Sequence, residues 1–244
     1  MYLKKVTLLR EKIPSFSQYP FSIPAIKNLD ELHFTQHVTF FIGENGTGKS
    51  TLLEAIADKC EFNTAGGSRH NMYEVYASES DLGDYIRLSW MPKVTNGFFL
   101  RSESFYQFAS HIDDVGSDDV GFQHYGGRSL HEQSHGESFL SLFLYRFKND
   151  KAIYLLDEPE AALSPQRQLT FLRILHDLSH NGRCQFIIAT HSPILLGYPD
   201  ATIYSFDEGI IKQVAYEDTL HYSITKYFLN HREKMLKDIL ADEN

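Results

Sequence analysis

Residues 38–51 have the sequence VTFFIGENGTGKST, and this stretch decides what the chain can fold into. Its first five residues are β-branched or aromatic, which is typical of a buried parallel strand. Residues 43–50 satisfy G-x-x-x-x-G-K-[ST], the P-loop or Walker A pattern. From Lys49 to Cys60 apolar side chains recur every three or four residues, which predicts an amphipathic helix. A strand, a glycine-rich turn and a helix in this order predict a phosphate cradle of backbone amides.

The residue types in this predicted cradle fit a nucleoside triphosphate with magnesium. Lys49 is expected to bridge the β- and γ-phosphates, Ser50 to ligate Mg²⁺ and Thr51 to donate to the α-phosphate. A glycine-rich turn with an incidental lysine is the plainer alternative, and the strand and helix on either side argue against it. The predicted nucleotide-binding residues are Gly43, Asn45, Gly46, Thr47, Gly48, Lys49, Ser50 and Thr51.

A second apolar strand, expected over residues 152–156, leads directly into two carboxylates, Asp157 and Glu158. Alternation along a strand sends neighbouring side chains to opposite faces, so we expect the two acids to have different roles. Asp157 fits a partner of Mg²⁺ that acts through its waters, and Glu158 fits the catalytic base that polarises the attacking water. In the alternative interpretation, Asp-Glu-Pro merely ends a strand at the surface.

A third predicted strand, over residues 186–189, delivers His191 to the same edge of the sheet. The separation from Asp157 is 191 − 157 = 34 residues, enough for one helical crossover. We expect His191 to be the second catalytic residue, which contacts the γ-phosphate and holds Glu158 and the water in line. Because the chain contains 12 histidines, a structural or exposed role is the alternative for any one of them.

Residues 134–138, SHGES, precede an apolar segment that predicts a helix over residues 137–148. Ser134 and Gly136 would give this helix a second anion-binding end, with free N–H groups and a favourable dipole. Because the P-loop already holds the phosphates of its own chain, this end would face the γ-phosphate of a partner subunit. An ordinary helix N-cap is the alternative, and the pentapeptide alone favours it.

Together, the P-loop, the Ser-x-Gly-Glu helix start, the LLDEP strand end and the Thr-His-Ser turn resemble the ABC-type ATPase head over residues 38–197. The resemblance implies an ATPase that hydrolyses ATP to ADP and phosphate with Mg²⁺. It also implies that ATP binding joins two heads, as a homodimer or heterodimer, and that hydrolysis separates them. Ser134, Gly136 and Glu137 then match the signature motif presented in trans, and His191 matches the switch histidine.

The motifs differ from those of transport subunits. The signature is Gln-Ser-His-Gly-Glu instead of Leu-Ser-Gly-Gly-Gln, and the segment after Glu158-Pro159 lacks Thr-Ser-Ala-Leu-Asp. These forms are similar to the soluble branch, with chromosome-maintenance, DNA-repair and overcoming-lysogenization-defect ATPases, and to compact bacterial AAA-family ATPases. The resemblance implies a switch that works with an effector protein in DNA maintenance or phage defence. The alternative is the ATP-binding subunit of a membrane transporter.

The magnesium contact of the family's Q-loop has no obvious counterpart. No glutamine stands at the end of the predicted strand near residue 101, so Glu103 or Gln107 is the candidate metal or water contact. Tyr19, upstream of the P-loop, is the candidate for stacking the adenine, although core packing is the commoner role for any one aromatic residue. Arg128 is a candidate to reach a phosphate across the dimer, and an ordinary surface arginine is the favoured alternative.

Buried strands that alternate with helices predict an α/β sheet with helices on both faces. With the resemblance, the expected fold is a P-loop ABC-type head: a mostly parallel core sheet, an antiparallel β subdomain and a small helical signature subdomain. We expect one domain over residues 1–244, with approximate parts 1–105, 106–149 and 150–244. Two details are expected as well: antiparallel strands between residues 72 and 105, and inward-facing Leu169, Leu172, Leu175 and Leu178 on a helix that begins at Pro165.

Composition narrows the classes of function. Acidic residues outnumber basic ones by 32 to 23, so the formal charge of −9 gives no support to DNA as a partner. Two cysteines make no disulfide framework. No stretch approaches the roughly 20 apolar residues of an integral membrane segment, and the expected location is the cytoplasm. The Asn-Lys-x-Asp motif of GTPases is absent from the sequence, which favours ATP over GTP.

Overall fold

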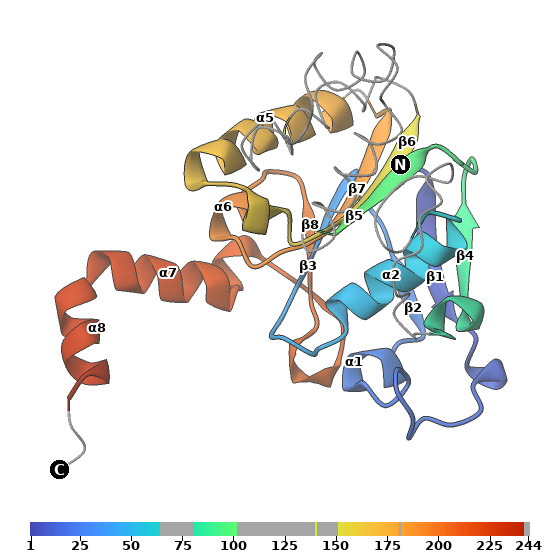
Figure 1. Ribbon diagram of the computed structural model, residues 1–244, viewed down its shortest axis with the longest axis horizontal. Coiled ribbons are helices and arrows are strands. Elements are labelled where there is room, and N and C mark those ends of the chain that lie inside the picture. The colour runs from blue at the N-terminus through green and yellow to red at the C-terminus, as the bar shows by residue number, and fades with distance from the viewer. Residues whose placement is uncertain (64–80, 102–139, 141–150, 181, 242–244) are drawn as a thin grey trace, which may run out of the picture.

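The computed structural model describes residues 1–63, 81–101, 140, 151–180 and 182–241, and it contains two β-sheets with helices packed around them (Figure 1). The strands are β1 (Leu3–Leu8), β2 (Glu31–His33), β3 (Val38–Ile42), β4 (Ile86–Trp90), β5 (Gly97–Arg101), β6 (Ala152–Asp157), β7 (Cys184–Ala189), β8 (Thr202–Ser205) and β9 (Lys212–Val214). The helices are α1 (Pro24–Lys27), α2 (Lys49–Lys59), α5 (Pro165–His180), α6 (Pro193–Leu196), α7 (Leu220–Asn230) and α8 (Arg232–Ile239).

The six-stranded sheet has the order β5-β6-β7-β3-β8-β9 and is parallel except for β9 at its edge. Strands β6, β7 and β3 are neighbours, although α5 and other long segments separate them in the sequence. Their register aligns Asp157 with Ala189, and Ala189 with Phe41, so the three strands end side by side. The segments that follow them therefore meet at one edge of the sheet.

Both faces of this sheet are buried, as the continuous apolar runs predict. Along β3, Phe40 and Ile42 pack on the side of α5, whereas Phe41 packs on the side of α2. Helix α2 also contacts β4 of the small antiparallel sheet, which has the order β2-β1-β4 (Figure 1). The structure thus confirms a P-loop type α/β core with helices on both faces and an antiparallel β part.

The predictions for individual elements were largely confirmed. Strands β3, β6 and β7 and helices α2 and α5 lie where the sequence places them, and the N–H of Arg167 donates to Ser164 Oγ at 3.4 Å at the start of α5. The helix predicted over residues 137–148, apart from Leu140, and the predicted signature subdomain fall outside the described residues. Of the predicted helix only Leu140 is described; it is helical and packs against the core.

Two predictions were wrong. Of the strands expected to be antiparallel between residues 72 and 105, β4 pairs antiparallel with β1, but β5 is parallel to β6 in the core sheet. The first four residues of β5 are buried, the mark of a strand covered on both faces. On α5, Leu169 is 53% exposed, because the inward row runs through Gln168, Phe171 and Leu175.

Helices α7 and α8 project from the body of the molecule (Figure 1). Neither contains a buried residue, and the apolar side chains of Leu220 and Ile224 on α7 are 56% and 53% exposed. Across the described ranges, none of the helices is both long and apolar enough to span a lipid bilayer.

Candidate functional site

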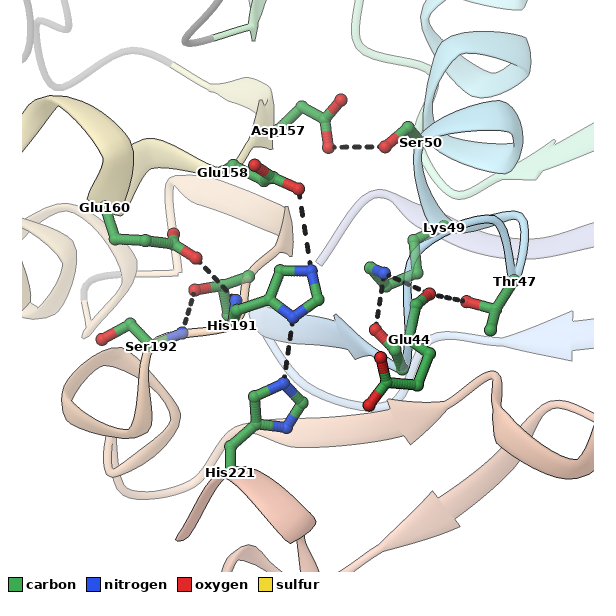
Figure 2. Close-up of polar contacts among 12 residues, drawn as sticks. Glu44, Thr47, Lys49, Ser50, Asp157, Glu158, Glu160, His191, Ser192 and His221 are labelled. Carbon is green, nitrogen blue, oxygen red and sulfur yellow. Dashed lines mark hydrogen bonds and ion pairs between the residues drawn. The ribbon is translucent and has the colours of Figure 1, made fainter. Parts of the chain in front are cut away.

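The candidate site lies where β3, β6 and β7 end, and it gathers Lys49, Ser50, Asp157, Glu158 and His191 (Figure 2). Lys49 and Ser50 open α2 after the loop that follows β3, Asp157 is the last residue of β6, and His191 follows β7. The parallel topology alone brings these residues together, since they are up to 142 positions apart in the chain (191 − 49).

The loop between β3 and α2 depends on glycine. Gly46 and Gly48 have φ angles of +81° and +100°, in the left-handed region that side chains with a Cβ rarely adopt. At Gly48 a Cβ would also lie 3.0 Å from Ile23 Cγ2. The loop is braced from outside by the N–H of Glu44, which donates to Asp207 Oδ1 at 2.9 Å. This conformation leaves the start of α2 available to an anion.

Lys49 places a buried positive charge across this loop. Its side chain is 5% exposed, and Nζ donates to the carbonyl oxygens of Gly43 at 2.6 Å and Glu44 at 3.0 Å. Burial lowers the pKa of Lys49, while the nearby carboxylates of Glu158 and Asp157 act in the opposite direction. An ammonium held here among acids is suited to a phosphate, which would supply further negative charge.

Ser50 and Asp157 form the oxygen-rich part of the site. Ser50 Oγ donates to Asp157 Oδ1 at 3.0 Å, and Asp157 is 6% exposed. Magnesium is usually held by one or two protein oxygen ligands together with waters and substrate phosphates, and these two side chains fit that donor set. Burial raises the pKa of Asp157 from 3.8 to about 6, against the opposing effects of Arg101 and of the Ser50 hydroxyl.

Arg101, the last residue of β5, connects Asp157 to α2. Its Nη1 lies 2.6 Å from Glu54 Oε1, and its Nε lies 3.8 Å from Asp157 Oδ2. Glu54 is 7% exposed, so this is a largely buried acid–base–acid row beside the predicted metal position. Removing Arg101 would take away the cation that these two carboxylates share.

Glu158 has a strained backbone. Its φ and ψ angles are 51° and 52°, the left-handed conformation, which costs a non-glycine residue on the order of 1–2 kcal/mol. Its N–H donates to the carbonyl of Ala189 at 2.9 Å, which fixes this turn to the end of β7. The Glu158 carboxylate lies with Oε1 3.7 Å from His191 Nε2 (Figure 2). Such strain is characteristic of functional positions.

His191 is held from three directions. Its N–H donates to Glu160 Oε1 at 2.5 Å, its Nε2 faces Glu158, and its Nδ1 lies 3.0 Å from Nε2 of His221 on α7. Glu160 is half-buried; desolvation of its carboxylate raises its pKa, and the hydrogen bond from the His191 N–H acts against that rise. His191 is thus held with Nε2 toward the carboxylate of Glu158 and Nδ1 toward His221.

The remaining predicted residues differ in their placement. Tyr19 is 62% exposed, with its hydroxyl 3.5 Å from Thr51 Oγ1, so an exposed ring stands beside the helix start. By contrast, Phe21 is buried against Tyr85, and Phe16 packs under Arg10. The predicted residues that lie outside the described part of the chain are Glu103, Gln107, Arg128, Ser134, Gly136 and Glu137.

Sequence reasoning missed five residues of this site: Glu54, Arg101, Glu160, Asp207 and His221. Arg101 was missed because its parallel pairing with β6, which the sequence did not predict, is what places it opposite Asp157. For His221 no signal exists in the sequence, since its position depends on where α7 leaves the body of the molecule.

We expect the ionisation of Asp157 to have a measurable effect on stability. Because its folded pKa is raised, the folded state holds the proton more tightly than the unfolded state, and stability falls as pH rises from about 4 to about 6. A rise of about two pKa units lowers the free energy of unfolding by about 3 kcal/mol, and this loss is complete above about pH 6. We therefore expect Asp157→Asn to raise the free energy of unfolding at pH 7.5 by about 1–3 kcal/mol in metal-free buffer.

Urea denaturation of both proteins at pH 4.5 and pH 7.5, with EDTA, measures this effect. The difference between variant and parent should shrink toward zero at the lower pH. Asp84→Asn is the matched control, because Asp84 pairs with Lys59 at the surface and should show no such pH dependence. If the free energies of unfolding of variant and parent differ by the same amount at both pH values, burial of the charged Asp157 carboxylate is not the cause.

The chain is similar to proteins of known families. Residues 58–197, more than half of the chain, match the family model described as "AAA domain, putative AbiEii toxin, Type IV TA system", and residues 15–85 match a model described as "AAA domain". The hemin import ATP-binding protein HmuV of Nocardia farcinica is 28% identical over 196 residues, which cover 72% of this chain and 67% of that protein. The zinc transport system ATP-binding protein AdcC of Streptococcus pneumoniae is 22% identical over 171 residues, 62% of this chain and 70% of that protein.

Among solved structures, an ATP-binding cassette of an ABC transporter in its ADP conformation aligns with a TM-score of 0.53. The alignment covers 99% of this chain and all of that chain, at 16% sequence identity. At this identity the similarity shows the fold, and the fold is that of an ABC-type ATPase head.

Proposed function

Since this chain belongs to the AAA-domain family whose model matches residues 58–197 and is a P-loop ATPase with an ABC-type head, we propose that it hydrolyses ATP to ADP and phosphate with Mg²⁺ and that ATP-driven pairing of two heads makes it a switch. One observation carries the proposal: the buried Lys49, the Ser50–Asp157 pair and the Glu158–His191 pair converge at the ends of three adjacent strands. Phosphate binding, metal binding and water activation each have their residues there.

Each group has a role that follows from its position. The amides at the start of α2 and the ammonium of Lys49 bind the β- and γ-phosphates. Ser50, and Asp157 through a water, hold Mg²⁺, which when bound neutralises charge that develops on the phosphates. Glu158 accepts a hydrogen bond from the attacking water and orients it, and His191 donates from Nε2 toward the γ-phosphate and keeps Glu158 in place. Tyr19 stacks on the adenine.

The proposal that two heads pair rests on the sequence resemblance. Ser134, Gly136 and Glu137 supply, in trans, a second helix end for the γ-phosphate of the partner subunit. ATP then contacts both subunits, and loss of the γ-phosphate removes the contacts that join them. A ligand that binds the paired state better than the separate state shifts the equilibrium toward pairing, which is the physical content of the switch.

The direct test is release of inorganic phosphate from ATP by the purified chain, with Mg²⁺ and with EDTA. We expect turnover only with Mg²⁺, and ATP should compete successfully against GTP. Absence of turnover under all conditions, with ATP bound, would reduce the protein to a nucleotide binder.

Ser134→Arg tests the trans arrangement. The larger, positively charged side chain should block ATP-dependent dimerisation and lower turnover, while each monomer still binds ATP through its own P-loop. Size-exclusion chromatography with light scattering, in ATP and in the absence of nucleotide, measures pairing, and fluorescence of a labelled ATP measures monomer binding. If monomers of the variant also lose ATP, the trans assignment is wrong.

Two biological settings remain for such a switch. We propose that the pairing of heads acts on an effector protein, because the signature and the segment after Glu158 differ from those of transport subunits. The alternative is the ATP-binding subunit of a transporter, favoured by the names of HmuV and AdcC. Affinity capture with the Glu158→Gln form in ATP separates the two: a membrane-spanning partner would support the alternative. The net charge of −9 does not support DNA as a partner of this chain. Salt-dependent binding of DNA by the purified chain would support it.

A further inference from the structure

His221 stands directly behind the residue proposed to contact the γ-phosphate. Its Nε2 is 3.0 Å from His191 Nδ1, while the opposite nitrogen of His191 lies 3.7 Å from Glu158 Oε1 (Figure 2). Glu158, His191 and His221 therefore form a row that runs from the predicted water position to the first turn of α7. A histidine at the end of such a row can determine which nitrogen of the middle ring carries the proton.

The surroundings assign the protons in this row. When both imidazoles are neutral they share one hydrogen bond, so either His221 Nε2–H donates to His191 Nδ1 or the reverse. In the first arrangement His191 carries its proton on Nε2, where it faces the Glu158 carboxylate. In the second, a bare nitrogen lone pair would face that carboxylate, which is repulsive.

The outer nitrogens of the two rings favour the same arrangement. Within the described part of the chain, two buried ring nitrogens of this pair, His221 Nδ1 and His191 Nε2, have no hydrogen-bond partner. Either arrangement therefore leaves one buried N–H without a hydrogen bond, a cost of about 1–3 kcal/mol, but a proton on His191 Nε2 faces the Glu158 carboxylate at 3.7 Å, which offsets part of that cost. Burial lowers the pKa of His221, and the neighbouring His191 lowers it further, which keeps the ring neutral with a single N–H to place.

The first turn of α7 is fixed well enough to hold this geometry. Thr219 caps the helix: its Oγ1 accepts from the N–H of Tyr222 at 3.2 Å and donates to the carbonyl of Tyr216 at 2.8 Å. The hydroxyl of Tyr216 in turn donates to the carbonyl of Pro193 at 2.8 Å, two residues from His191. The segment that carries His221 is thus tied to the segment that carries His191.

We infer that His221 is a positioning residue, which donates from Nε2 to His191 Nδ1 and thereby holds the proton of His191 on Nε2, toward Glu158 and the γ-phosphate. The inference rests on the proposed function, because the proton of His191 matters for catalysis only if His191 acts on a phosphate. His221 itself touches no substrate, so its removal should slow the chemical step and leave ATP binding intact.

Three variants test this role by steady-state ATPase kinetics. His221→Leu should lower kcat about tenfold, with KM for ATP changed less than about twofold, as is typical when the partner that fixes a histidine tautomer is lost. His221→Gln keeps an N–H donor at a similar reach and should stay within about threefold of the parent. His231→Leu, at the far end of the same helix where His231 packs on Tyr227, should leave kcat unchanged.

A double-mutant cycle separates positioning from packing. In a His191→Ala background the further change His221→Leu should alter kcat less than about twofold, because its effect passes through His191. A tenfold effect that persists without His191, or a Gln variant as slow as the Leu variant, would overturn the inference.

A second measurement does not depend on turnover. In protein labelled with ¹⁵N-histidine, the His191 ring should show the proton on Nε2 in the parent and in His221→Gln, and a mixture of tautomers in His221→Leu. If the parent does not hydrolyse ATP, the proposed function fails and this spectrum still decides the role of His221. If the parent hydrolyses ATP and the His191 tautomer is the same in all three proteins, only the inference fails.

Discussion

Replacing Glu158 with glutamine is expected to lower ATP turnover at least about 100-fold while ATP stays bound, the loss typical when a general base is removed. The amide has the shape of the carboxylate but cannot accept a proton from water. Lys49, Ser50 and Asp157 are untouched, so the phosphate cradle and the metal position remain. The variant should accumulate as an ATP-bound dimer, because the step that separates the heads no longer occurs.

Phosphate release and light scattering on the same samples measure both parts of this result. Glu208→Gln is the control, since Glu208 forms an exposed pair with Lys212 at 2.6 Å and lies outside the proposed machinery. Normal turnover by Glu158→Gln would exclude Glu158 as the base. If turnover is lost but no dimer accumulates, Glu158 is still supported as the general base, and the proposed pairing of heads is contradicted.

Replacing Lys49 with alanine should weaken ATP binding by about 100-fold, equivalent to about 3 kcal/mol. The ammonium is the buried positive charge of the cradle, and without it Asp157 and Glu158 would repel the phosphates unopposed. Lys49→Arg should fail as well, because a planar guanidinium does not fit a site that holds a compact ammonium between two carbonyls 2.6 Å and 3.0 Å away.

Binding of a fluorescent ATP analogue by both Lys49 variants tests this expectation. Lys59→Ala is the matched control at the other end of α2, where Lys59 pairs with Asp84 at the surface. Equal ATP affinity in Lys49→Ala and Lys59→Ala would show that the ammonium is not a phosphate ligand.

The sequence predicted the core of the fold because its signals are local. The apolar runs of β3, β6 and β7 are typical of parallel strands covered on both faces, and glycine at positions 46 and 48 permits the positive φ angles of a tight turn. The same signals placed Asp157, Glu158 and His191 after strand ends, and Lys49 and Ser50 at the start of a helix. Because β6, β7 and β3 are parallel neighbours in the sheet, these residues then lie together at one edge of it.

The sequence could not predict contacts that depend on which strands become neighbours and where a helix leaves the body. The Gly97–Arg101 segment was expected to be antiparallel, and only its parallel pairing with β6 puts Arg101 between Asp157 and Glu54. Leu169 was expected to face inward, but packing selected the neighbouring row of α5.

By itself, then, the amino-acid sequence determined the family of folds and the residues proposed for the chemistry, because spacing along strands and loops is a property of the chain. The tertiary structure alone decided what surrounds those residues: the Arg101–Glu54 pair beside Asp157, and His221 behind His191. These contacts join segments whose separation in the sequence carries no periodic signal, and their geometry depends on which strands are neighbours in the sheet and on where α7 leaves it.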